Sequence, residues 1–198
     1  FDTGQVVTAM VGPPGIEGRF FYNDALDGFN FVPQRQRIAT VFDALATHLD
    51  DPAPPALYVG STAIDACLPG LLAPDALAMG ERDPLVSLWL GNRSRIPAHQ
   101  DLPDNLACVV AGQRRFTLFP PEQLPNLYVG PLDFTPAGQP VSLVDITAPD
   151  LDRFPRYAEA QRHALVAELA PGDALLIPSM WWHHVEGLEA FNVLVNYW

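Results

Sequence analysis

Four polar side chains in two distant parts of this chain could hold one metal ion. His99 and Asp101 lie two residues apart, and the adjacent histidines His183 and His184 follow much later. On a β-strand, side chains at i and i+2 point to the same face, so His99 and Asp101 can bind one ion together. A third ligand at His183 would complete a two-histidine, one-carboxylate triad. Such a triad leaves coordination positions open, which suits Fe(II) that binds a co-substrate and O2 side by side.

Residue spacing alone leaves two points about this triad undecided, the choice of the third ligand and the class of metal site. His183 and His184 face opposite ways on a strand, so only one can reach the ion, and alternation alone does not choose between them. A zinc hydrolase could also use two histidines and a carboxylate, but its usual His-Glu-x-x-His helix motif is absent from the sequence. We expect His48 and His163 to lie on the surface rather than to bind the ion.

Composition narrows the classes of partner. The 198 residues have 48% hydrophobic content and a net charge of −12, so we expect one domain with a sizeable core and no nucleic-acid partner. Every basic residue is Arg, so an anionic ligand must be held by Arg, His or neutral donors. No apolar run reaches ~18 residues, which argues against a membrane helix. The isolated Cys67 and Cys108 are expected to be free thiols.

The chain opens at Phe1 with no initiator Met and no signal-like segment. We therefore expect a piece of a longer protein, and we expect it to be cytoplasmic.

Hydrophobic periodicity predicts mostly strands. Apolar residues spaced by three and four predict one amphipathic helix over 36–49, and a second helix is expected near 156–166. Short β-rich runs between Gly and Pro residues predict strands elsewhere. The expected strands are 5–11, 19–22, 28–32, 56–60, 85–91, 96–101, 105–111, 114–119, 174–178, 181–186 and 191–198.

Many short strands joined by tight turns favour a sandwich or a barrel with the metal in its mouth. Ala111-Gly112-Gln113 is predicted to be a tight hairpin turn. Residues 121–170 are too many for an ordinary loop, so we expect this segment to cover the site. We predict one domain over 1–198, with flanking strands and a helix in 1–54 and the barrel core in 55–198.

Several motifs occur in the order and spacing of one known family. They are Pro97-Ala-His-Gln-Asp101, Asn105, Gly112-Gln-Arg-Arg-Phe-Thr-Leu-Phe-Pro-Pro121, Pro171-Gly-Asp173, Ile177-Pro178, Trp181-Trp-His-His-Val-Glu186 and Asn196-Tyr-Trp198. Together they make residues 55–198 resemble the JmjC/cupin-like 2-oxoglutarate oxygenases, and most closely the asparaginyl hydroxylase that acts on hypoxia-inducible factor. The resemblance implies a mainly β fold, a double-stranded β-helix (cupin or jelly-roll barrel) with a few flanking helices.

The resemblance also implies roles for individual residues. Fe(II) would be held by His99, Asp101 and His183, and 2-oxoglutarate would chelate it as the co-substrate. Asn105 and Asn196 match amides near the chelating end of 2-oxoglutarate. At the distal carboxylate, Arg114 replaces a Lys of the relative and keeps its charge, and Tyr58 matches a Tyr. Ile96 stands where the relative has a Thr, so one hydrogen bond of the relative is missing.

The implied activity is that of a 2-oxoglutarate-dependent dioxygenase, a hydroxylase that couples decarboxylation of 2-oxoglutarate to oxidation of a substrate C–H bond. The substrate would be a protein side chain or a small molecule. Segment 121–170 and the loop near 23–29 would shape its pocket, although the aromatic Phe29, Tyr128, Phe134 and Phe154 fit core packing better. The relative dimerises, so a homodimer is compatible with the resemblance.

Two alternatives use the same residues differently. The first is a non-catalytic, metal-binding cupin-like module for ligand binding or sensing. The second is a cupin of another reaction class, which would not need Arg114.

Overall fold

The computed structural model describes residues 4–72 and 77–198, and their strands form two antiparallel sheets. The large sheet has the order β2-β1-β3-β4-β11-β6-β9, and the small sheet has the order β5-β10-β7-β8. The strands are β1 (Val6–Gly12), β2 (Val32–Arg37), β3 (Ala56–Ala63), β4 (Val86–Gly91), β5 (Arg95–Gln100), β6 (Asn105–Ala111), β7 (Arg114–Phe119), β8 (Leu165–Leu169), β9 (Ala174–Ile177), β10 (Trp182–Gly187) and β11 (Asn192–Tyr197).

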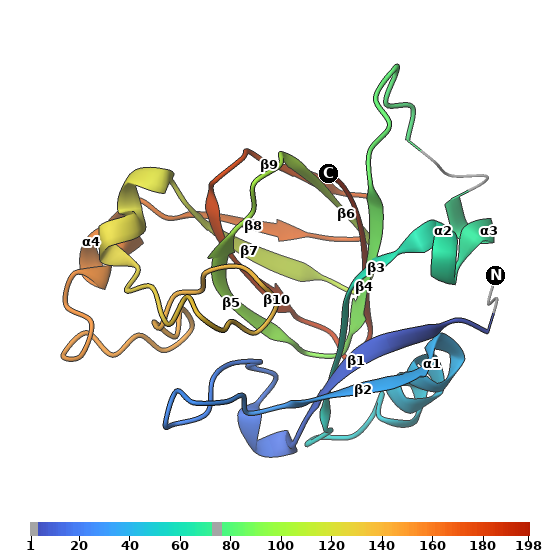
Figure 1. The fold of residues 1–198 in the computed structure, drawn as a ribbon, viewed down its shortest axis with the longest axis horizontal. Coiled ribbons are helices and arrows are strands. Elements are labelled where there is room, and N and C mark those ends of the chain that lie inside the picture. Colours follow the sequence, from blue (N-terminus) through green and yellow to red (C-terminus); the bar gives the residue numbers. More distant parts are fainter. Residues whose placement is uncertain (1–3, 73–76) are drawn as a thin grey trace.

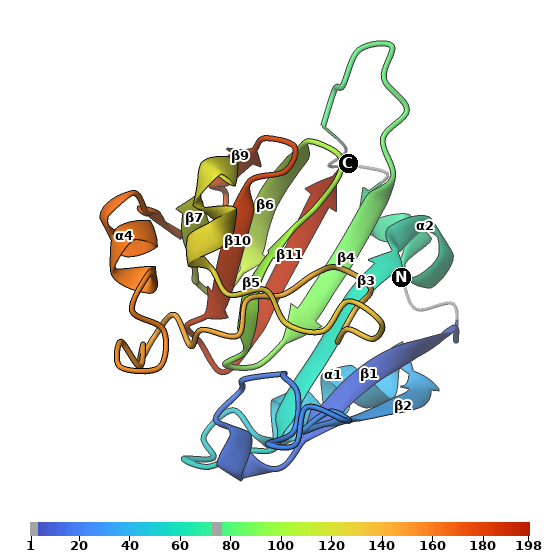
Figure 2. The same cartoon turned by 60° about the vertical axis from the view of Figure 1, so that its left-hand side comes forward.

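The last eight strands pair in a nested order. Strand β4 pairs with β11, β5 with β10, β6 with β9 and β7 with β8, so each strand of the first half meets its counterpart from the second half. From β4 to β7, and again from β8 to β11, successive strands alternate between the two sheets, as in a jelly roll. Figure 1 shows the two sheets facing each other, and Figure 2 shows β1, β2 and β3 extending the large sheet at one side. The predicted mainly β jelly-roll fold is confirmed.

Short helices flank this framework. They are α1 (Ile38–Thr47), α2 (Ile64–Cys67), α3 (Pro69–Leu72) and α4 (Tyr157–Arg162), with 3-10 turns at Pro14–Ile16 and Pro121–Asn126. The buried face of α1 carries Ile38, Val41 and Leu45, which pack on the outer face of the large sheet with Leu88 and Leu90. Within the described residues, no helix has the length and apolar character needed to cross a membrane.

A second apolar cluster fills the space between the sheets. Phe116 and Leu118 of β7 meet Val109 of β6, Val185 of β10 and Leu194 of β11 there. Burial of these side chains holds the sheets together and leaves the polar residues of the same faces around a cavity.

The predicted hairpin at Gly112 is wrong. Strand β6 belongs to the large sheet and β7 to the small one, so the turn between them changes sheets instead of joining paired strands. Gly112 has φ +73°, and a Cβ there would lie 2.4 Å from the Phe191 carbonyl oxygen. The turn is tight, as expected, but local sequence does not reveal which strand each half will pair with.

Two predicted strands near the start of the chain also differ from the structure. Residues 19–22 make only isolated bridges, and β2 begins at Val32 rather than near residue 28. The Asn30 side chain explains both differences, because it accepts a hydrogen bond from the Phe21 N–H and donates one to the Arg19 carbonyl. These side-chain hydrogen bonds occupy backbone N–H and C=O groups that would otherwise pair with a neighbouring strand. Helix α1 starts two residues later than predicted because Gln36 and Arg37 pair in β2.

Segment 121–170 lies over the small sheet for most of its length but ends as part of it. The helix expected near 156–166 is only Tyr157–Arg162, and Leu165–Leu169 forms β8 beside β7. The cover itself is attached to β5, because Ser142 N–H donates to the Ala98 carbonyl at 2.7 Å and His99 bridges Val141. Our division of the chain at residue 54 stays a prediction.

Candidate metal and co-substrate site

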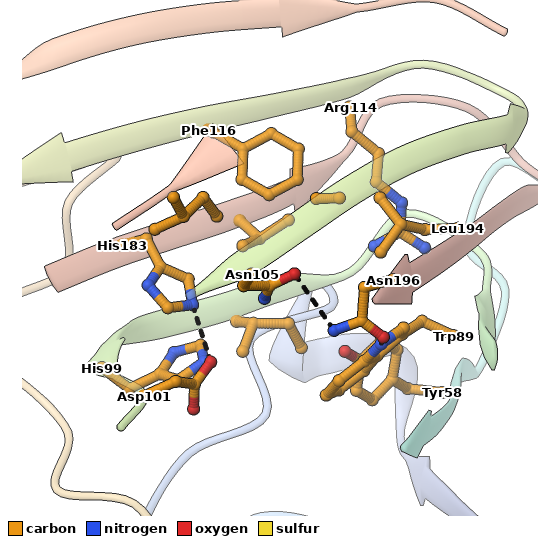
Figure 3. A pocket seen from close by; sticks show the side chains of 14 residues that line it. Tyr58, Trp89, His99, Asp101, Asn105, Arg114, Phe116, His183, Leu194 and Asn196 are labelled. Atoms are coloured by element: carbon orange, nitrogen blue, oxygen red, sulfur yellow. Dashed lines mark hydrogen bonds and ion pairs between the residues drawn. The ribbon is translucent and has the colours of Figure 1, made fainter. Parts of the chain in front are cut away.

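Strands β5 and β10 bring the predicted metal-binding residues together. His99 lies near the end of β5 and pairs directly with His183 of β10, and Asp101 follows one residue after β5 ends. One potential ligand atom from each of these three residues lies within 4.8 Å of the other two. The His183 Nε2 atom is 3.4 Å from Asp101 Oδ2. Figure 3 shows the three side chains converging at one end of a cavity.

Backbone carbonyls orient both imidazoles. His99 Nδ1 lies 2.8 Å from the Pro97 carbonyl oxygen, and His183 Nδ1 lies 3.1 Å from that of Trp181. A carbonyl only accepts, so each Nδ1 carries the proton and each Nε2 lone pair remains available to a metal. Burial, aided by the neighbouring His183, lowers the pKa of His99 to about 4. His99 is therefore neutral at physiological pH, as a metal ligand must be.

Asp101 is kept ionised by its neighbours. Burial raises the pKa of this carboxyl, but its interactions with His183, His99 and the Gln139 amide outweigh the effect of burial and leave the pKa lowered. Gln139 Nε2 donates to Asp101 Oδ1 at 3.1 Å. Our sequence analysis missed Gln139, which comes from the covering segment in a run of Gly and Pro that carries no periodic signal.

The structure separates the two adjacent histidines. His184 lies on the opposite face of β10 from His183, with 3% of its surface exposed, and its nearest carboxylate oxygen is Glu186 Oε1 at 3.9 Å. Neither of its ring nitrogens has a hydrogen-bond partner among the described residues. Of the other histidines, His48 contacts Asp51 and His163 contacts Glu159, both away from the cluster.

Arg114 occupies the other end of the same cavity, as Figure 3 shows. It is only 2% exposed, and its Nε and Nη2 atoms have no hydrogen-bond partner among the described residues. Its neighbour Arg115 is more exposed and pairs with Glu168 and Glu186 instead. Tyr58, 5% exposed, lies beside Arg114, whose positive charge partly opposes the burial that raises the pKa of the tyrosine. A buried guanidinium with free donors is an uncompensated charge, and a carboxylate would satisfy it.

A row of hydrogen bonds lies between the two ends. Trp89 Nε1 donates to Asn196 Oδ1 at 2.6 Å, and Asn196 Nδ2 donates to Asn105 Oδ1 at 3.2 Å. Because the indole can only donate, it fixes the orientation of both amides and leaves Asn105 Nδ2 free to donate into the cavity. Our sequence analysis did not single out Trp89. Its place between Leu88 and Leu90, which are core residues of the outer face, is a signal that it faces inward.

The remaining site predictions have mixed outcomes. Ile96 does line the cavity, where it offers only an apolar side chain. Phe29, Tyr128, Phe134 and Phe154 pack in apolar clusters, and none of them lines the cavity. The loop at 23–29 borders a separate, polar hollow instead. Both cysteines are free thiols, as predicted.

A jelly-roll barrel with a His-Asp-His cluster at its mouth defines the cupin class. The chain belongs to the cupin-like domain family, since the model of that family matches residues 1–198. It is 30% identical to the human bifunctional peptidase and (3S)-lysyl hydroxylase JMJD7, over 97% of this chain and 67% of that protein. It is 39% identical to human HSPB1-associated protein 1 over 57% of this chain. The zebrafish tRNA wybutosine-synthesizing protein 5 is 37% identical over 50% of this chain and 27% of its own length.

The comparisons also bear on size and fold. The chain spans only 23% of the length of human HSPB1-associated protein 1. The solved structure of E. coli ycfD superimposes with a TM-score of 0.52 at 16% identity, covering 98% of this chain and 41% of that one. At that identity the likeness supports the jelly-roll fold.

Proposed function

We propose that this chain is an Fe(II)- and 2-oxoglutarate-dependent oxygenase, a hydroxylase. The observation that carries the proposal is a single cavity with a neutral His, a second His and a carboxylate at one end and an unpaired buried arginine at the other. Family membership and the name of the lysyl hydroxylase relative support the same activity.

The donor set fits the metal. Two imidazole Nε2 atoms and one carboxylate oxygen form the ligand set of non-heme Fe(II) oxygenases, and the backbone bonds at each Nδ1 hold the rings in place before the ion arrives. We assign His99, Asp101 and His183 as its ligands. Bound iron and 2-oxoglutarate would supply the oxidising chemistry, with O2 consumed and 2-oxoglutarate converted to succinate and CO2.

The chain's own residues bind and orient the co-substrate. Arg114 would pair with the distal carboxylate of 2-oxoglutarate, and the Tyr58 hydroxyl beside it would add a further hydrogen bond. Asn105, with its amide set by Asn196, would donate to the carboxylate or keto oxygen at the metal end. Phe116 and Leu194 provide buried apolar walls for this cavity.

The substrate class and location are proposals of the same kind. A relative whose name specifies lysyl hydroxylation supports a protein side chain as the substrate. The two free thiols support a reducing compartment such as the cytoplasm, and a homodimer stays a prediction.

The direct test is anaerobic titration of the metal-free chain with Fe(II) and then 2-oxoglutarate. We expect a weak visible charge-transfer band that requires both additions, and its loss in His99→Ala and Asp101→Ala variants with unchanged far-UV circular dichroism. Slow conversion of 2-oxoglutarate to succinate in air would distinguish an enzyme from a non-catalytic binding module. Absence of the band would overturn the proposal, and a band without any turnover would favour the binding module.

A further inference from the structure

A second cavity adjoins the first and opens between the covering segment and the start of the large sheet. This outer cavity shares Tyr58, Trp89, Ile96 and His99 with the first, inner cavity. Because His99 belongs to both, a group in this outer cavity lies next to the proposed metal position. Its other described walls come from β1, Phe20, Gly60 and Ser61 of β3, Pro97 of β5 and residues 136–141.

The described lining of the outer cavity carries no Asp, Glu, Arg or Lys side chain. Met10, Phe20, Ile96 and Val141 provide apolar walls. Its polar groups are neutral or already engaged, because Gln139 Nε2 donates to Asp101 and the His99 Nδ1 atom is bonded to Pro97. This is unexpected in a chain with 23 acidic residues and a net charge of −12.

The inner cavity does not provide a net charge that could pair with an ionised group in the outer cavity. The summed charge of this cavity is zero, because Asp101 and Arg114 have opposite signs and the two carboxylates of 2-oxoglutarate would balance a divalent metal. A cationic or anionic side chain that entered the outer cavity would therefore lose its hydration without gaining an ion-pair partner.

The wall formed by residues 136–141 is held in place by hydrogen bonds to the rest of the fold. The Val141 backbone bridges His99, and the adjacent Ser142 N–H bonds the Ala98 carbonyl. Further along, the Tyr22 hydroxyl donates to the carbonyls of Pro131 and Phe134 at 3.1 Å. These contacts hold Pro136–Gln139 over the metal end on both sides.

We propose that the outer cavity receives an uncharged, largely apolar side chain of the substrate, and that it discriminates against lysyl or other ionised groups. This inference rests on the proposed function, because it takes the outer cavity as the place of the substrate group that is oxidised. It separates this chain from any relative that oxidises a cationic lysine side chain.

The test compares two probes that differ in charge, 1-hexanol and hexylammonium chloride. Their binding to the metal-free chain is measured by saturation-transfer NMR, and repeated with Mn(II) bound, where relaxation of the probe protons reports proximity to the metal. We expect 1-hexanol to bind at least tenfold more tightly, although the net charge of the chain would attract the cation. We also expect Mn(II) to relax the protons of bound 1-hexanol.

A pair of variants locates the effect. Ala137→Asp adds a carboxylate at the exposed edge of the outer cavity, whereas Ala46→Asp makes the same change in net charge on the exposed face of α1. Ala137→Asp should reduce the preference for 1-hexanol at least fivefold, and Ala46→Asp should leave it unchanged.

Equal or tighter binding of hexylammonium, binding of neither probe, or an equal response in both variants would overturn the inference. The metal-free measurement does not depend on iron or 2-oxoglutarate. Failure of the oxygenase proposal would be seen separately, as a missing charge-transfer band.

Discussion

The two ends of the inner cavity differ in whether their polar groups already have partners within the fold. At the metal end, His99, Asp101 and His183 already contact one another or backbone carbonyls in the fold. At the other end, Arg114 is buried, but two of its nitrogens have no hydrogen-bond partner among the described residues. The metal end is therefore preorganised, whereas the arginine end is complete only when an anion enters.

The largest expected effect comes from breaking the preorganised end. Asp101→Ala removes a metal ligand, and because loss of an outer partner alone costs about 10- to 100-fold in metal affinity, loss of the ligand should cost more than about 100-fold. Fe(II) titration monitored by calorimetry measures this. Gln139→Ala, which removes only the partner of Asp101, should fall within the smaller range. Equal losses in both variants would mean that Asp101 is not a ligand.

Removing the charge of Arg114 should have opposite effects on co-substrate binding, which it weakens, and on the stability of the ligand-free chain, which it increases. Arg114→Met deletes charge-assisted bonds to the co-substrate, so we expect the KM for 2-oxoglutarate to rise roughly 10- to 100-fold. The same change removes a buried, unpaired guanidinium, so the free energy of unfolding of the ligand-free chain should increase by about 1 kcal/mol or more. Urea denaturation and turnover of 2-oxoglutarate measure the two effects.

The matched control is Arg115→Met, one residue away. Arg115 faces the surface and pairs with Glu168 and Glu186. It should leave the KM unchanged and give no gain in stability. A loss of stability in Arg114→Met would contradict the idea that this end lacks a partner.

Acid should weaken the ligand-free fold through its buried histidines. Burial lowers the pKa of His99 and of His184 to about 4 each, below the ordinary value near 6.5. As the pH falls from 6.5 toward 4, these histidines become protonated in the unfolded chain but stay neutral in the folded chain. The free energy of unfolding therefore decreases across this pH range. Between pH 7 and 5 we expect a loss of about 1–2 kcal/mol for each histidine.

Urea denaturation at the two pH values measures this loss. The His99→Gln and His184→Gln variants should each show a smaller pH dependence than the parent chain. A double variant with the same dependence as the parent would refute the assignment.

The smallest effect is expected between the two ends. Trp89→Phe keeps an aromatic ring but removes the donor that orients Asn196 and, through it, Asn105. Since one hydrogen bond contributes about 0.5–1.5 kcal/mol, the KM for 2-oxoglutarate should rise roughly 2- to 10-fold with little change in kcat. Trp198→Phe is the control, because the Trp198 indole bonds Ser87 outside the amide row. Equal shifts in both variants would indicate a general packing effect.

Sequence reasoning located most of the strands because alternation of apolar and polar residues is a local property. It also placed His99 and Asp101 on one strand face, and the family resemblance singled out Arg114, which the structure buries. The failures have a common physical cause. The sheet change at Gly112, the missing strand at 19–22 and the extra strand β8 all depend on which distant backbone groups supply hydrogen bonds.

The sequence by itself determined which chemistry this protein can carry: histidines and carboxylates with strand spacing, arginine as the sole basic side chain, and motifs shared with the cupin-like family. Only the tertiary structure decided that His183 rather than His184 meets His99, that Gln139 and Trp89 orient the polar groups, and that the outer cavity lacks charge. The reason is that residue type and alternation are local properties of the sequence. The pairing of β5 with β10 and the position of segment 121–170 arise instead from contacts between residues far apart in the chain.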